Sequence, residues 1–389
     1  MKKVFLCAVM VFVLCSCSTY THNNNTQAVD GGIWISFYEL NAMLKSESGF
    51  ESEFQEVINN SKSLNCKNLY IHTRAFGETL YNSDYFPKIS AAKDYDYDIL
   101  DYIVKECHKA GLLVHAWINP YRISTNEEVE KLNAKSPAYV WLNDDVIEND
   151  ENIAFAQGIY LNPATADVRS LILDGIRELL TNYDIDGIHF DDYFYPSQSE
   201  TFDKISFAQY KKDGLLSLEE WRRENVNLLI SSVYGTVKYM KKDVIFSISP
   251  AASIENNYNN LYADVALWIQ EGWIDEIIPQ LYFGFRYPDE SFCFEALLKE
   301  WKSLVKSNPR VALKIGLAAY KAVPNLEADK SEWQAESDII ARQVKICDSD
   351  FQISGYVYFS YSSLFSNKAA YKKQLQNILD YLKQEKTNE

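Results

Sequence analysis

The chain has 389 residues, and its 54 Asp and Glu residues outnumber its 38 Lys and Arg residues to give a formal charge of −16. This balance argues against a nucleic-acid partner, because a protein that binds phosphates needs a basic surface. A hydrophobic fraction of 47% is ordinary for a globular protein and is enough for a large core.

The first predicted element is a targeting segment rather than part of the fold. Two lysines precede an apolar run over residues 4–14, which is too short to span a bilayer as a mature helix and is typical of a signal peptide. The Leu-Cys-Ser-Cys tetrapeptide that ends at Cys17 resembles a bacterial lipobox, in which Cys17 would be lipidated. A plain secretory signal is the alternative.

These features divide the chain into three predicted parts. Residues 1–16 form the signal peptide, residues 17–30 hold the lipidated cysteine and a polar tether, and residues 31–389 form one domain. We therefore expect a protein of the bacterial cell envelope, lipid-anchored to a membrane and facing outside the cytoplasm.

Eight short β-rich apolar runs follow along the domain, each with a segment of helical period after it. The predicted strands are 32–37, 68–74, 113–119, 187–191, 244–249, 277–282, 312–317 and 355–360. The predicted helices are 51–64, 98–110, 166–182, 217–241, 262–271, 292–305, 332–347 and 368–383. Strict alternation favours a parallel sheet, and eight units predict an α/β fold of the (β/α)8 TIM-barrel type.

Three connections are much longer than the usual few residues. Residues 73–93, 120–165 and 192–216 follow the second, third and fourth predicted strands. All three belong to the carboxyl-terminal face, where barrel enzymes build their sites. They favour a one-sided cleft, although decorative surface insertions would give the same pattern.

Side-chain alternation indicates which residues of the fourth strand face the cleft. The strand carries an apolar pair, Ile188 and Phe190, which should pack against the outer helices. His189 and Asp191 then point into the barrel, with Asp191 at the carboxyl end of the strand. Asp192 begins the loop that follows.

The same phase places further polar and aromatic residues inside the barrel. They are Trp34, Ser36, His72, Arg74, His115, Trp117, Asn119, Ser247, Ser249, Gln280, Tyr282, Tyr356 and Tyr358. So many polar groups would be costly in a dry core, so their clustering predicts a polar pocket. For His72 or Ser247 alone, a hydrogen-bonded core group explains the residue equally well.

Among the strand residues that this alternation points into the barrel, Asp191 is the acidic one. Glycosidic cleavage usually needs two carboxyl groups astride the bond, one of them an acid. Asp191 as nucleophile or base and Glu78 as proton donor would meet that need if the second loop folds inward. Aromatic rings could stack on sugars and polar groups could bind hydroxyls, namely Trp34, Trp117, Tyr193, Tyr282, Arg74, His115, Asn119 and Gln280.

Other reaction classes receive less support. The chain contains no G-x-S-x-G nucleophile elbow and no nucleotide-binding glycine fingerprint. Three inward histidines with Asp191 could form a metal site, but no H-x-H or H-E-x-x-H pair is present. We therefore expect no metal and no cofactor, while a metal-dependent hydrolase such as a deacetylase remains an alternative, as does a non-catalytic glycan-binding barrel.

Several motifs occur together in an order that resembles the glycosyl hydrolase-like 10 family. They are 32–35 (GIWI), 74–87 (RAFGETLYNSDYFP), 115–122 (HAWINPYR), 186–196 (DGIHFDDYFYP), 249–250 (SP), Trp268 and 279–282 (PQLY). The resemblance covers roughly residues 30–365. It implies a (β/α)8 barrel that acts on glycans, and exported bacterial members include ones that cut peptidoglycan glycan strands.

The resemblance also implies roles for individual residues. Asp191 and Asp192 would be the central acidic pair, and the pocket wall would include Arg74, His115, Asn119, Arg122 and His189. The family usually has Gly-Asp where this chain has Gly77-Glu78, so the carboxylate is kept with a longer reach. The resulting prediction is a glycoside hydrolase acting on an extracytoplasmic polymeric glycan, with peptidoglycan glycan strands as a candidate substrate.

Overall fold

A closed parallel barrel forms the centre of the molecule. The computed structural model describes residues 29–323 and 332–388, and within them eight parallel strands close in the order β1-β11-β10-β9-β8-β7-β3-β2. Their bounds are β1 Asp30–Ile35, β2 Cys66–Arg74, β3 Leu113–Ile118, β7 Gly187–Phe190, β8 Ile245–Ile248, β9 Glu276–Ile277, β10 Ala312–Ala318 and β11 Gly355–Phe359. The predicted (β/α)8 barrel is confirmed. The predicted signal peptide and Cys17 lie outside the described residues.

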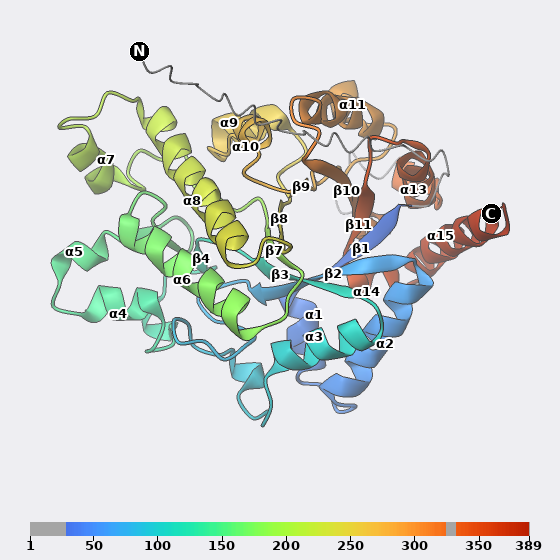
Figure 1. The fold of residues 1–389 in the computed structure, drawn as a ribbon, viewed down its shortest axis with the longest axis horizontal. Helices are drawn as coiled ribbons and strands as arrows, with labels where there is room; N and C mark the ends of the chain where they lie inside the picture. Colours follow the sequence, from blue (N-terminus) through green and yellow to red (C-terminus); the bar gives the residue numbers. More distant parts are fainter. Residues whose placement is uncertain (1–28, 324–331, 389) are drawn as a thin grey trace, which may run out of the picture.

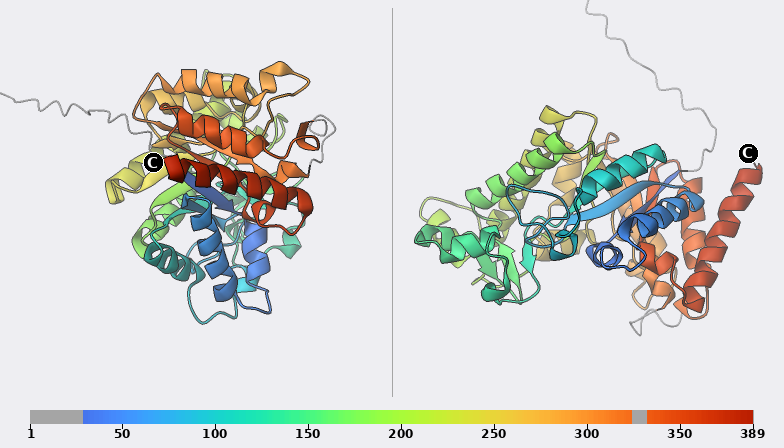
Figure 2. Two further views of the ribbon diagram at one scale, coloured as in Figure 1. Left: turned by 90° about the vertical axis from the view of Figure 1, so that its right-hand side faces the viewer. Right: turned by 90° about the horizontal axis from the view of Figure 1, so that it is seen from below.

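A ring of helices surrounds the strands (Figure 1). It comprises α2 Phe50–Ser63, α3 Ile99–Lys109, α6 Ala166–Asn182, α8 Leu218–Met240, α10 Val265–Glu271, α11 Phe294–Val305, α13 Ile339–Ser349 and α15 Ala369–Asn388. Figure 2 shows α15 lying along the outside of the barrel beside α13. Within the described residues, none of the helices combines the length and apolar character needed to cross a membrane.

Local signals in the sequence explain where several helices begin. Asp98 accepts the backbone N–H groups of Leu100 and Asp101 and so caps α3. Ser217 and Glu220 form a reciprocal capping box at the start of α8. The prediction of a strand over 277–282 was too long, because Pro279 has no backbone N–H to donate to a ladder and β9 ends before it.

The long loops contain elements that the periodicity did not predict. The connection after β3 holds a small antiparallel sheet in the order β4-β6-β5 and two short helices. The additional elements are β4 Arg122–Ser124, β5 Ile153–Phe155, β6 Ile159–Leu161, α1 Phe37–Met43, α4 Pro137–Asn143, α5 Ile147–Asp150, α7 Lys204–Tyr210, α9 Ile254–Asn260 and α14 Tyr361–Leu364. In Figure 1 the helices α4, α5 and α7 lie at the end of the molecule opposite α15.

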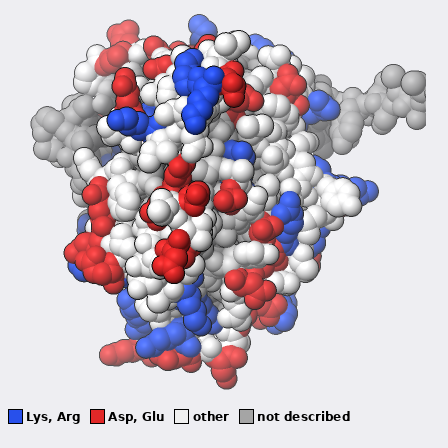
Figure 3. Space-filling view, turned by 90° about the vertical axis from the view of Figure 1, so that its left-hand side faces the viewer, with Lys and Arg blue, Asp and Glu red and all other residues white. Residues whose placement is uncertain are grey.

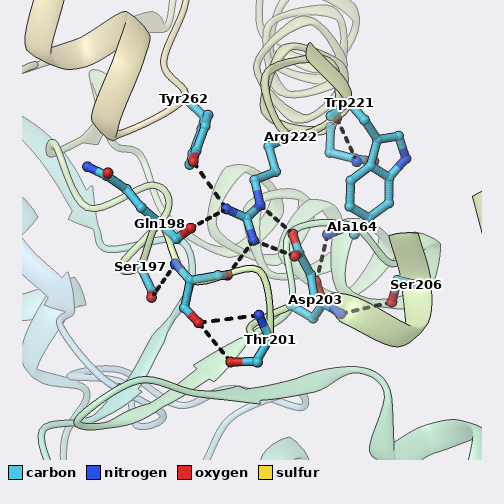
Figure 4. A network of polar contacts seen from close by, with 12 residues as sticks. Ala164, Ser197, Gln198, Thr201, Asp203, Ser206, Trp221, Arg222 and Tyr262 are labelled. Carbon is cyan, nitrogen blue, oxygen red and sulfur yellow. Dashed lines mark hydrogen bonds and ion pairs between the residues drawn. The ribbon is translucent and has the colours of Figure 1, made fainter. Parts of the chain in front are cut away.

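A buried ion pair fixes the loop that follows β7 (Figure 4). Arg222 on α8 donates to both carboxylate oxygens of Asp203, with Nε–Oδ2 at 2.9 Å and Nη2–Oδ1 at 2.6 Å. The same guanidinium donates to the Ser199 carbonyl and to the Tyr262 hydroxyl. Both charged side chains are fully buried, so this network holds the loop to the helix layer.

Candidate active site

A cavity of about 880 Å³ opens among the carboxyl ends of the barrel strands. It brings together eight of the predicted site residues from β1, β3 and the segments that follow β3, β7 and β9. They are Trp34, Trp117, Arg122, Asp191, Asp192, Tyr193, Gln280 and Tyr282. The expectation of a one-sided pocket at this end of the barrel therefore agrees with the geometry.

Asp191 lies at the floor of this cavity, directly after β7. Its Oδ2 accepts a hydrogen bond from Trp117 Nε1 at 3.0 Å, and its Oδ1 accepts one from the Tyr193 N–H at 3.3 Å. Burial, with the neighbouring charge of Asp192, raises the pKa of Asp191 to about 7, against the lowering effects of Trp117, Arg122 and the Tyr193 N–H. A carboxyl group with this pKa can hold or release a proton at neutral pH.

Asp192 lines the same cavity beside Asp191. Burial raises its pKa, while a hydrogen bond from the Gln280 side chain and the charge of Arg122 act in the opposite direction. Gln280 is itself oriented by donating its Nε2 to the Ser249 carbonyl at 3.0 Å. The negative charge of Asp192 favours the protonated form of Asp191.

Neutral histidines position the tryptophans around the acidic pair. Trp34 Nε1 donates to His189 Nε2 at 3.0 Å, so the proton of that imidazole is on Nδ1, which contacts Ser247 Oγ at 2.8 Å. Burial lowers the pKa of His189 to about 3. His72 stacks on Trp117 with ring centroids 3.6 Å apart. These histidines therefore act as uncharged supports for the indole rings.

Arg122 forms one wall of the cavity. Its guanidinium lies over the ring of Tyr193 at 4.3 Å and over the ring of Phe76 at 4.9 Å. The same charge lowers the pKa values of Asp191 and Asp192. Arg122 thus favours the ionised state of both carboxyl groups.

Two of the predicted pocket residues hold the backbone instead. Arg74 is buried, donates to the Pro120 carbonyl at 3.1 Å and lies over the ring of Phe86. Asn119 is fully buried and accepts the backbone N–H of Arg122. Neither side chain lines the cavity that holds Asp191, so the expectation that they form its wall is corrected. In β2 the register shifts between His72 and Arg74, so the alternation that predicted an inward Arg74 does not hold at the end of the strand.

His115 occupies the opposite end of the barrel. It lines a separate cavity with Glu276 and Lys314, and its Nε2 contacts Asn68 Oδ1 at 3.1 Å. His115 points into the barrel as the side-chain alternation predicted. It lies near the start of β3, however, and therefore at the amino-terminal end of the barrel, away from the carboxyl-terminal mouth. The expected role of His115 in sugar binding is not supported by this position.

The structure does not bring Glu78 into the cavity that holds Asp191. Glu78 lines a separate cavity of about 220 Å³, where it is half-buried and bonded to Asn133. The Gly77 N–H bonds to the Ile123 carbonyl at 3.1 Å and ties this loop to β4 instead of the barrel mouth. The expected pairing of Glu78 with Asp191 across a sugar is therefore corrected.

Glu39 is a cavity residue that the sequence analysis left without a role. It accepts the Ser36 N–H at 2.6 Å, the Ser360 hydroxyl at 2.8 Å and the Ser362 N–H at 2.5 Å. These bonds join the segment after β1 to the segment after β11. The Ser-x-x-Glu pattern of a capping box, directly after the first strand, was the signal that could have revealed it.

Among residues 29–323 and 332–388, no group of three or more His, Cys, Asp or Glu side chains is arranged to hold a metal ion. The three inward histidines are separated along the barrel, since His115 contacts Asn68 at one end while His72 stacks on Trp117 beneath the mouth. The expected absence of a metal stays a prediction.

Comparison with known proteins assigns the family. The model of the glycosyl hydrolase-like 10 family matches residues 31–335. The chain belongs to this family. It is 31% identical over 376 residues to glycosyl hydrolase YngK of Bacillus subtilis, covering 89% of this chain and 71% of that protein. It is also 31% identical over 310 residues to glycosyl hydrolase DigH of Escherichia coli K12, covering 74% and 67%.

Solved structures support the fold of this glycosyl hydrolase-like 10 protein. The glycoside hydrolase domain of PgaB from Bordetella bronchiseptica superposes with a TM-score of 0.60 at 14% identity, covering 89% of this chain and 98% of that one. A GH18 chitinase from Cycas revoluta gives a TM-score of 0.51 at 12% identity, covering 90% and 99%. Family membership confirms the predicted enzyme class, a glycoside hydrolase.

Proposed function

We propose that this glycoside hydrolase cleaves a polymeric glycan outside the cytoplasm, with peptidoglycan glycan strands as the first substrate to test. The observation that carries the proposal is the buried carboxyl of Asp191, with its pKa raised to about 7, at the floor of an aromatic cavity. An acid of this kind can protonate the leaving oxygen of a glycosidic bond at neutral pH.

The raised pKa changes the role proposed for Asp191. A nucleophile must be ionised, whereas a carboxyl with a pKa near 7 is suited to deliver a proton and then recover it. Asp191 therefore acts as the general acid and base. Asp192, oriented by Gln280, carries the negative charge that stabilises the positive charge developing on the sugar ring.

The aromatic walls support the choice of a sugar substrate. Trp34 and Trp117 are fixed by hydrogen bonds from their indole N–H groups, and Tyr282 stacks against Phe359 at 5.8 Å. These buried indoles form a fixed base, and the exposed ring of Tyr193 and the partly buried ring of Tyr282 supply apolar surface for the C–H face of a pyranose. The carboxylates and Gln280 meet its hydroxyls.

The substitutions Asp191→Asn and Asp192→Asn test the proposal. Asp191→Asn should lower the rate of glycan cleavage by about 10²- to 10⁴-fold, because a positioned proton donor contributes about this much. Asp192→Asn should lower it by about 10²- to 10³-fold, because it removes a charge that stabilises the transition state. The substrates are intact cell-wall sacculi and peptide-free glycan strands, and the products are identified by mass spectrometry. Asp243→Asn, an exposed carboxylate at the amino-terminal end of β8, is the matched control and should retain full activity.

Two outcomes would overturn the assignment. Turnover retained by Asp191→Asn would remove Asp191 from the chemistry. Glycan that binds to the wild-type protein but yields no product would instead support the non-catalytic glycan-binding alternative.

We also propose that the mature protein is anchored to a membrane through a lipid on Cys17, in the bacterial cell envelope. The support is the Leu-Cys-Ser-Cys motif and the polar segment between it and β1. This placement would bring the cavity to glycans outside the cytoplasm.

A further inference from the structure

A second cavity lies directly beside the one that holds Asp191. Its volume is about 600 Å³, and it shares four lining residues with the first cavity, namely Asp192, Gln280, Tyr282 and Tyr320. The two cavities therefore meet beside Asp192. A ligand that extends past Asp192 from the first cavity enters the second.

Aromatic side chains dominate the far wall of this second cavity. Phe283, Tyr287 and Phe292 line it, and all three come from the long connection between β9 and α11. Their rings form a cluster, with centroid separations of 5.0 Å between Phe283 and Tyr287 and 5.4 Å between Phe283 and Phe292. All three are only partly buried, so they present surface to the cavity.

Packing of the loop alone does not account for this arrangement. Rings that served only to stabilise the loop would be fully buried, as the nearby ring of Phe294 is, with no exposed surface. The three rings instead border an open cavity that continues to Tyr282, the residue that both cavities share. The charged residues that line it are Asp192 and Lys321, and the Lys321 ammonium lies over the ring of Phe283 at 5.0 Å.

We infer that the second cavity is a distal sugar-binding subsite and that the enzyme cleaves its glycan internally. The inference rests on the proposed function and adds to it a mode of action. The first cavity holds the chain on one side of the scissile bond, Asp191 and Asp192 lie at the bond, and the aromatic cluster holds a sugar on the other side. Uncharged pyranose faces are the ligand that such rings recognise.

The substitutions Tyr287→Ala and Phe292→Ala test this subsite. Peptide-free glycan strands are separated by length, and kcat/KM is measured for long strands and for the shortest strand that the wild-type enzyme cleaves. Each variant should lose about five- to tenfold on long strands, through KM, and less than twofold on the shortest. The loss on long strands converts to about 1.0–1.4 kcal/mol, which is within the range for one stacked ring. Tyr239→Ala, an exposed aromatic residue on α8, is the matched control.

The wild-type products provide the second readout. Internal cleavage should yield fragments of intermediate length from the first minutes of digestion. Release of terminal sugars alone, or equal losses of the variants on long and short strands with an unchanged melting temperature, would overturn the inference while leaving the proposed function intact. Failure of the wild-type enzyme to cleave any strand would instead remove the proposed function on which the inference rests.

Discussion

The pKa of Asp191 is set by neighbouring groups whose effects oppose each other. Burial and the charge of Asp192 raise its pKa, whereas Trp117, Arg122 and the Tyr193 N–H lower it. The alternation of the fourth strand was sufficient to predict that this carboxyl points into the barrel mouth. Sequence alone could not give its protonation, because Trp117 comes from another strand and contributes through a contact across 74 residues of chain.

The substitution Asp191→Asn should stabilise the fold above neutral pH although it lowers the rate of cleavage. The pKa of this carboxyl is about 7 in the folded protein and about 3.9 in an unfolded chain. The folded state therefore binds the extra proton between these values, and the free energy of unfolding falls as pH rises from about 4 to about 7. Asparagine cannot ionise and avoids this loss.

Urea unfolding at two pH values measures this effect. The variant should match the wild type at pH 4 and exceed it at pH 8 by on the order of 2–4 kcal/mol, which corresponds to the raised pKa. If the variant and the wild type had the same free energy of unfolding at pH 8, ionisation of Asp191 would not destabilise the folded state.

The substitution Trp117→Phe should shift the alkaline limb of the pH–activity profile upward. It removes the indole N–H that stabilises ionised Asp191, so the pKa of that carboxyl should rise by about 1 unit, since a hydrogen bond to a charged group is worth about 1.5 kcal/mol or more. The measurement is kcat/KM against pH. Trp273→Phe, outside the cavity, is the control, and an unshifted profile for Trp117→Phe would exclude this coupling.

At the scale of elements, the regular alternation of strands and helices was predictable, and the short elements were not. Helices such as α2 and α3 carry an apolar side over three or more turns, which periodicity detects. Strands such as β4–β6 have three residues each and depend on pairing with one another. The course of the Glu78 loop depends on such pairing, which is why its distance from the site could not be predicted.

The substitution Arg222→Ala should destabilise the protein strongly. It would leave the carboxylate of Asp203 buried without its partner, and breaking a buried pair in this way costs about 3–5 kcal/mol. Thermal and urea unfolding measure the loss. Arg223→Ala, the adjacent and partly exposed arginine, should cost less than about 1 kcal/mol, and similar losses for both variants would show that the Arg222 network (Figure 4) is not a stabilising feature.

At the scale of the whole molecule, the net negative charge of the protein affects how it could be held at a membrane. Figure 3 shows acidic side chains spread over the face that carries α5 and α7, with Lys and Arg in separate groups between them. The full chain has a formal charge of −16, and a protein with this excess of acidic residues is repelled by anionic lipid surfaces. Retention at a membrane would therefore depend on the proposed lipid.

The substitution Cys17→Ala should release the protein from the membrane. Fractionation of cells that produce the full-length chain should move more than about nine-tenths of the protein from the membrane to the soluble or secreted fraction, because the lipid is the hydrophobic contact that the motif supplies. Cys66→Ala, a buried cysteine in the barrel, is the matched control and should stay with the membrane. Unchanged membrane association of Cys17→Ala would contradict the lipid anchor.

The barrel closes between its first and last strands, and Glu39 bonds across that junction to Ser360, 321 positions away in the chain. The ring therefore cannot close during synthesis until β11, which ends at Phe359, is available. Truncation at residue 335, where the family match ends, would remove the strand that seals the ring. We expect shortened translation or proteolysis products to be inactive, with activity beginning only once the last strand has joined the first.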